Sequence, residues 1–281
     1  MSYLRYGLNA LGRAVDLDYF ADGHRGGAII SGSCLCREEP VDDGVAHAIA
    51  QGINRQWLGT PLCADFPDEE ARPELTQRVV EAMLANISGL RQVGHNVILP
   101  TLALKAFRHD PDAVTSARID GICRLAAAFT VTEVPPSASG PSIPDPGEAT
   151  AFAEFVLREF IDCSERFLGR GQGWSGHLLT YARALLDLHE LGLQRVADQA
   201  LDGFATYVRR IRMGPQGSDK ERPEHPPKSI MPLQADYWKQ RAGDWSLGHV
   251  LKYPYGYYGL QRHVTRADLI ARCEAVSYRI F

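Results

Sequence analysis

The feature that most constrains the fold of this chain is a histidine that recurs at the head of four similar segments. The four histidines are His24, His95, His177 and His249. Each begins an apolar run, which is followed by a polar turn and then by a segment of helical periodicity. Recurrence of this kind indicates a chain built from repeated supersecondary units.

The segment before each histidine also has helical periodicity, and it ends at a glycine. In the second copy the apolar positions include Leu75, Val79 and Met83, which share one face of a helix. Each unit is therefore expected to contain three helices, broken at the glycine, with the histidine at the N-terminus of the middle helix.

The stretches between the units are rich in Pro, Gly, Ser and charged residues, which disfavour helix; they span 58–73, 130–147 and 212–229. No run alternates apolar and polar residues for long enough to predict a sheet. The sequence thus predicts an all-α fold and a single domain over 1–281. Its four repeat units span about 1–57, 74–129, 148–211 and 230–281.

The middle helices, which include "NVILPTLALKAF", "LLTYARALLDL" and "VLKYPYGYYGL", are apolar on nearly every side. Helices of this kind are typical of positions surrounded by protein. Four of them, ringed by amphipathic helices, predict an α/α toroid or barrel-like array closed around a central cavity. Equivalent residues would converge in such an array, so the four histidines are expected at one end of the cavity.

A group of histidines at helix N-termini favours neutral imidazole, because the helix dipole and the neighbouring rings both disfavour a positive charge. Neutral imidazole is a metal ligand, and four of them suit Fe, Cu, Ni or Zn. We therefore predict a metal site formed by His24, His95, His177 and His249. A single buried histidine of this kind can instead satisfy backbone groups near a helix start.

Further polar residues on the middle helices are predicted to line the cavity as catalytic groups: Tyr181, Tyr253, Asp187 and Lys105. Each also has a structural interpretation. Lys105 can extend along apolar surface to reach water, Asp187 can pair with Arg183 on a solvated helix face, and the tyrosines can pack in the core.

Two acids precede their histidines, Asp22 and Asp244. Either can orient an imidazole or cap a helix. The first copy, "HRGGAIISGSC", is small and glycine-rich where the other copies are bulky, and such residues can leave room for a substrate.

The helix start "GHLLTYARALLDLHELG" resembles the His-led helices of questin oxidase-like proteins. The resemblance covers only these starts, best at His95, His177 and His249 and poorly at His24. That family is helical and is associated with Baeyer–Villiger-type oxidation of polyketides. The resemblance implies oxidation of a hydrophobic small molecule.

Composition and motifs exclude several other classes. A net charge of −4 gives no basic field for nucleic acid. No apolar run has the length of a membrane span or signal peptide, and the six scattered cysteines favour reduced thiols in the cytoplasm. No phosphate-binding, hydrolytic-zinc or nucleotide-cofactor motif occurs. Self-association into a homo-oligomer stays open.

Three functions remain. The first is a metal-dependent oxidoreductase or oxygenase that acts on a hydrophobic or aromatic small molecule. The second is a metal-free lyase, cyclase or isomerase that uses His and Tyr as acid and base. The third is a repeat-built binding protein that presents a concave surface to a partner.

Overall fold

The computed structural model describes residues 2–134, 142–221, 224, 226–227, 229–241, 243 and 245–281. Within these ranges the chain forms α-helices and short 3-10 turns and no β-strand, which confirms the all-α prediction. The α-helices are α1 (Tyr3–Arg13), α2 (Tyr19–Glu38), α3 (Asp43–Gln56), α4 (Thr76–Ala85), α5 (His95–His109), α6 (Ser116–Ala128), α7 (Ala149–Arg166), α8 (Gly173–Glu190), α9 (Gln194–Arg212), α10 (Ala235–Gln240), α11 (His249–Gln261) and α12 (Ala267–Ser277). The 3-10 turns are η1 (Ala14–Asp16), η2 (Pro61–Cys63), η3 (Pro73–Leu75), η4 (Gln92–Gly94) and η5 (Pro111–Ala113).

The chain divides into two compact units, each assembled from separate stretches of sequence. The first unit comprises Met1–Ile87, His95–Phe129 and Pro232–Tyr255. The second unit comprises Ser88–Gly94, Thr130–Met231 and Gly256–Phe281. His24, His95 and His249 therefore belong to the first unit, and His177 belongs to the second.

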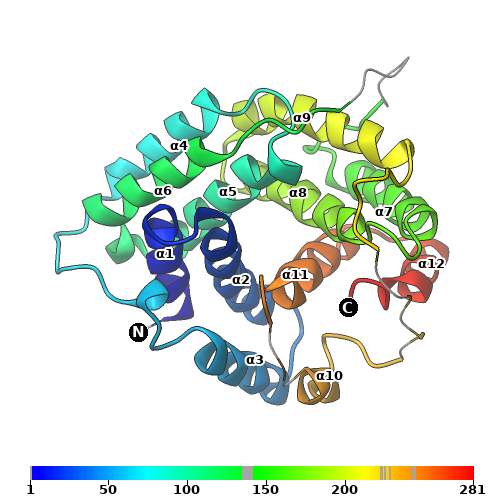
Figure 1. The fold of residues 1–281 in the computed structure, drawn as a ribbon, viewed down its shortest axis with the longest axis horizontal. Coiled ribbons are helices and arrows are strands. Elements are labelled where there is room, and N and C mark those ends of the chain that lie inside the picture. The colour runs from blue at the N-terminus through cyan, green and yellow to red at the C-terminus, as the bar shows by residue number, and fades with distance from the viewer. Residues whose placement is uncertain are drawn as a thin grey trace. The chain divides into compact units, whose positions relative to one another are not determined.

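In the first unit, α1 packs against both α2 and α6, and α5 packs against α2, α4 and α6 (Figure 1). The apolar stripe of α1 is Leu4, Leu8 and Leu11, all of which are buried. This spacing places the three side chains on one helix face, which explains how a short helix covers its neighbours.

In the second unit, α8 packs against α7 on one side and α9 on another, and α12 packs against α7. Apart from its ends, α8 is buried along its whole length, as its apolar sequence predicts. In α9, by contrast, the apolar residues face the core, and the polar residues are exposed or half-buried except Arg210, which is buried.

The glycine before the histidine lies directly before the start of an α-helix in only two of the four predicted cases. Gly94 and Gly248 adopt φ values of 96° and 70°, and α5 and α11 begin at the next residue, which is the histidine. The prediction is wrong for His24 and His177. The glycines before them lie inside α2 and α8, which begin at Tyr19 and Gly173.

The early start of α2 has a local cause. The side chain of Asp18 accepts hydrogen bonds from the backbone N–H groups of Phe20 and Ala21, at 3.1 and 3.0 Å, and so caps the helix a full turn before the histidine. The cap fixes the start, and the glycines that follow are carried within the helix.

The small residues of α2 allow close helix packing and do not leave space. A Cβ on Gly26 would lie 2.8 Å from the backbone nitrogen of Leu11 in α1. A Cβ on Gly27 would lie 2.6 Å from Cδ2 of Leu99 in α5. The room predicted for a substrate at these two positions is therefore filled by the neighbouring helices. Glycine within a helix lowers its stability, because it loses more backbone entropy on folding than other residues do.

None of the described helices combines the length and hydropathy that a membrane span requires. The 18-residue α8 illustrates the reason, because its buried face carries His177, Arg183 and Asp187. Polar side chains of this kind lower the mean hydropathy of an otherwise apolar helix.

Candidate metal centre in the first unit

Three of the four predicted histidines lie together in the first unit. The ring centroids of His24 and His95 are 4.1 Å apart, and those of His24 and His249 are 5.4 Å apart. His24 and His95 are each 1% exposed, and His249 is half-buried. The three rings come from α2, α5 and α11, so residues far apart in the sequence form one cluster.

The ring of His24 is held by its own helix. Its Nδ1 lies 2.6 Å from the backbone oxygen of Phe20. A carbonyl oxygen only accepts, so Nδ1 carries the hydrogen and Nε2 carries the lone pair of the neutral ring. A backbone bond of this kind fixes the tautomer and orientation that a metal-binding histidine needs.

Two of these rings approach the separation of metal ligands. One ring nitrogen of His24 and one of His249 lie within 4.8 Å of each other. Two nitrogens bound to one tetrahedral ion would lie about 3.3 Å apart, given metal–nitrogen bonds of about 2.0–2.1 Å. Binding of a common ion would therefore require side-chain rotation that brings these two nitrogens closer together.

The rest of the cluster is aromatic. Phe20 lies 4.4 Å from His24 and 5.9 Å from His95, and Phe129 lies 5.9 Å from His95, measured between ring centroids. Tyr253, a predicted catalytic residue, stacks on His249 at 4.7 Å with the rings 13° from parallel. These aromatic rings give the histidine cluster apolar surroundings.

Among the described residues, the contacts of Asp22 are with Arg25 and Asp18 and not with a histidine. Its carboxylate pairs with Arg25 at 2.7 Å and accepts a hydrogen bond from the backbone N–H of Asp18 at 3.2 Å. The second acid proposed for this role, Asp244, lies outside the described residues.

His177, the fourth predicted ligand, occupies a similar local environment in the second unit. Its Nδ1 lies 2.8 Å from the backbone oxygen of Gly173, four residues earlier in α8. The ring therefore has the same tautomer as His24, with the lone pair on Nε2. Its role as a metal ligand stays a prediction.

Lys105 lies in a buried polar network of the first unit. Its Nζ pairs with Glu38 at 2.8 Å and donates a hydrogen bond to the hydroxyl of Tyr255, also at 2.8 Å. Lys105 is 6% exposed, so it does not extend to water at a helix end. Glu38 was not among the predicted site residues. Its position on the same face of α2 as His24, four turns further on, is the signal that could have found it.

Asp187 and Tyr181 are buried in the second unit, where both have structural partners. Asp187 pairs with Arg183 at 2.7 Å, and both side chains are 1% exposed, so the predicted pair exists but is not on a solvated face. Tyr181 donates a hydrogen bond to the backbone oxygen of Ala200 at 3.0 Å, and burial raises the pKa of its hydroxyl. Catalytic roles for these two residues stay predictions.

A second group of possible ligands was missed by the sequence reasoning. Asp145, His189 and Asp198 in the second unit place ligand atoms within 4.8 Å of one another, with both acids exposed. The three residues come from a loop and two helices, and no motif links them in the sequence. Exposed acids often gather without a metal, so this group serves below as a control.

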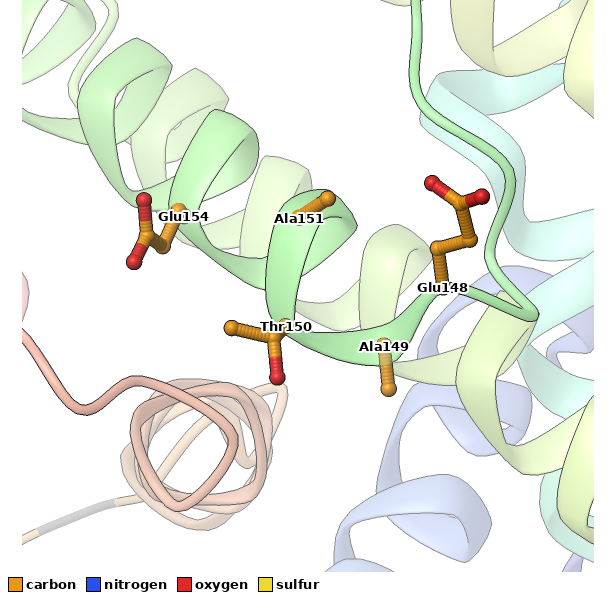
Figure 2. A pocket seen from close by; sticks show the side chains of 5 residues that line it. All are labelled: Glu148, Ala149, Thr150, Ala151 and Glu154. Carbon is orange, nitrogen blue, oxygen red and sulfur yellow. The ribbon is translucent and has the colours of Figure 1, made fainter.

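The surface also carries a hollow along the start of α7, lined by Glu148, Ala149, Thr150, Ala151 and Glu154 (Figure 2). All five residues come from one short segment, and the carboxylate of Glu154 pairs with Arg158 at 2.6 Å. The lining of this hollow contains no histidine and comes from a single short segment of chain, so the histidine cluster is the stronger candidate site.

Comparison of this sequence and fold with protein-family models, with curated proteins and with solved structures gives no match. The resemblance to questin oxidase-like proteins therefore stays a prediction, and the function is argued from the site.

Proposed function

We propose that this chain is a metal-dependent oxidoreductase, of the oxygenase type, that acts on a hydrophobic small molecule. One observation carries the proposal, namely the cluster that the buried His24 and His95 form with the half-buried His249 from three separate helices. A bound Fe, Cu, Ni or Zn ion would supply Lewis-acid or, for the redox-active metals, electron-transfer chemistry. The aromatic rings around the cluster favour an apolar substrate.

Repulsion between protonated rings explains why this cluster suits one shared metal ion better than protonation of each histidine. Imidazolium rings with centroids 4.1 and 5.4 Å apart would repel one another within an apolar wall. Neutral imidazoles can instead direct their lone pairs at one ion, and the bond from Nδ1 of His24 to the helix leaves Nε2 as its ligand atom.

The four-unit repeat belongs to the same proposal. Each histidine helix is the second of three successive helices: α1–α3, α4–α6, α7–α9 and α10–α12. In addition, α5 and α11 each carry a proline five residues after the histidine, Pro100 and Pro254. This order supports four related units, while the closed toroid and His177 as fourth ligand stay predictions.

Elemental analysis of untagged protein tests the proposal. The wild type should contain about one transition-metal ion per chain, and His24→Ala and His249→Ala should each weaken its binding roughly tenfold or more while circular dichroism stays helical. The exposed His47→Ala is the matched control and should keep the metal. His189→Ala tests the second group, Asp145, His189 and Asp198, separately. Loss of the metal only in that variant would falsify the assignment to the histidine cluster.

A metal-free lyase or isomerase is the second candidate, and one contact favours it. Lys105 donates a hydrogen bond to the hydroxyl of Tyr255 at 2.8 Å, which pairs an amine and a phenol of the kind that serve as acid and base. Activity that survives complete chelation and is lost in Tyr255→Phe would support this function over the metal-dependent one.

A further inference from the structure

Lys252 is an exception among the buried cations. Within the described ranges, the cationic side chains that are at least nine-tenths buried are Lys105, Arg118, Arg183, Arg210 and Lys252. The first four each have a carboxylate, amide or carbonyl partner. Lys252 is 2% exposed, and its Nζ has no hydrogen-bond partner in the part of the chain that the structure describes.

The position of Lys252 ties it to the histidine cluster. Lys252 follows His249 by three residues, so the two share a face of α11. A Cβ built on Gly27 of α2 would lie 3.9 Å from Cδ of Lys252, and Gly27 itself follows His24 by three residues. The lysine stem therefore lies within one helical turn of the cluster on two helices.

Two other polar atoms near the cluster are also unsatisfied. The hydroxyl oxygens of Ser31 in α2 and Thr101 in α5 are buried and have no hydrogen-bond partner among the described residues. Each lies within about two turns of the histidine on its own helix. All three histidine helices of the first unit thus carry a buried polar atom that has no hydrogen-bond partner among the residues that the structure describes.

An unpaired buried amine is costly unless a ligand uses it. Burial lowers the pKa of Lys252 well below its ordinary value, and the described residues offer no carboxylate that would hold it charged. A neutral amine is a nucleophile, and its natural electrophile is a carbonyl carbon.

We propose that Lys252 is a catalytic residue that forms an imine with an apolar aldehyde or ketone. The nitrogen lone pair attacks the carbonyl carbon, a C–N bond forms, and the carbonyl electron pair moves to oxygen. Two protons pass from nitrogen to that oxygen, the C–O bond breaks, and one water leaves for each imine formed. The step consumes no oxidant and needs no metal, so it stands apart from the proposed metal centre.

Reductive trapping tests this assignment on the full chain. The protein, treated with a chelator, is incubated with benzaldehyde and cyanoborohydride at neutral pH, and the modified peptides are mapped by mass spectrometry. The sequence has only five lysines, so the label can be assigned to one residue. We expect saturable benzylation of Lys252 at a rate at least roughly tenfold above that of the exposed Lys239, whose ion pair with Asp236 raises its pKa.

The variants complete the test. Lys252→Met should lose the rapid label, and the surface variant Lys239→Met should keep it. The site map of the wild type decides the question even if a variant misfolds. Labelling of Lys252 no faster than Lys239, or no labelling of Lys252 at all, would overturn the proposal, whatever metal the protein contains.

Discussion

Arg183 in the second unit and Lys252 in the first are both buried cations on histidine helices, and they differ in how they are satisfied. Arg183 is 0% exposed, pairs with Asp187 at 2.7 Å and donates to the backbone oxygen of Gly259 at 3.2 Å. Lys252 is 2% exposed and has no such partner in the described chain.

The difference distinguishes a structural charge from a functional one. A buried charge whose partners are supplied by the fold stabilises a particular packing, and removal of one partner is expensive. A buried amine without a partner lowers stability, and proteins retain such groups where activity requires them. The first type predicts loss of stability on substitution, and the second predicts a gain.

The largest effect is expected at the paired cation. Asp187→Ala removes the nearer carboxylate partner of the buried Arg183, which keeps only the longer pair with Glu190 at 3.4 Å, and it should lower the free energy of unfolding by about 3 kcal/mol. Denaturant unfolding followed by circular dichroism measures this change. Asp16→Ala, which removes the exposed partner of Arg124, is the control and should have a much smaller effect. Equal losses in the two variants would show that the Arg183 pair is not a structural charge.

Replacement of Lys252 is expected to change the free energy of unfolding in the opposite direction. Lys252→Met replaces an unpaired buried amine by an apolar side chain of similar length, and it should raise the free energy of unfolding by about 1–2 kcal/mol near neutral pH. Lys239→Met on the surface should leave it unchanged. A marked loss of stability in Lys252→Met would mean that the amine has a structural partner after all.

The pH dependence sharpens the Lys252 prediction. Because burial lowers its pKa, the unfolded chain binds a proton that the folded chain lacks as the pH approaches the ordinary value of 10.5. Wild-type stability therefore rises with pH through this range, and the advantage of Lys252→Met should shrink. Unfolding curves of both proteins at several pH values measure the convergence.

The change in stability on replacing Lys105 should lie between those of Asp187→Ala and Lys252→Met. It pairs with Glu38, but that carboxylate is 16% exposed and can be hydrated when the lysine is lost. Lys105→Met should therefore lower the free energy of unfolding by about 1 kcal/mol, less than Asp187→Ala. A loss as large as that of Asp187→Ala would show that the Lys105–Glu38 pair is as important for stability as the Arg183–Asp187 pair.

The smallest effect is expected from Tyr255→Phe. This change removes only the hydroxyl that accepts a hydrogen bond from Lys105, and the ion pair with Glu38 remains. The free energy of unfolding should fall by about 0.5–1 kcal/mol. A larger cost would show that the tyrosine, and not the carboxylate, is the main partner of Lys105.

Helical periodicity and the recurrent histidine predicted the all-α fold and selected the helices that carry the site. Local periodicity is enough for this, because the spacing of the apolar residues determines which face of a helix is buried. A glycine next to the histidine predicts a helix break, but α2 and α8 begin before that glycine, at Tyr19 and Gly173. In α2, the cap at Asp18 and the packing of the glycines against α1 and α5 decide otherwise.

The sequence by itself thus determined the helical class, the histidines as candidate ligands and the presence of polar groups inside apolar helices. Only the tertiary structure decided which of these groups are satisfied. Asp187 and Arg183 are four residues apart and meet within one helix, whereas Glu38, Lys105 and Tyr255 meet across three. Lys252 meets no partner among the described residues. Contacts between helices distant in sequence depend on packing, and the periodicity of a single helix carries no information about them.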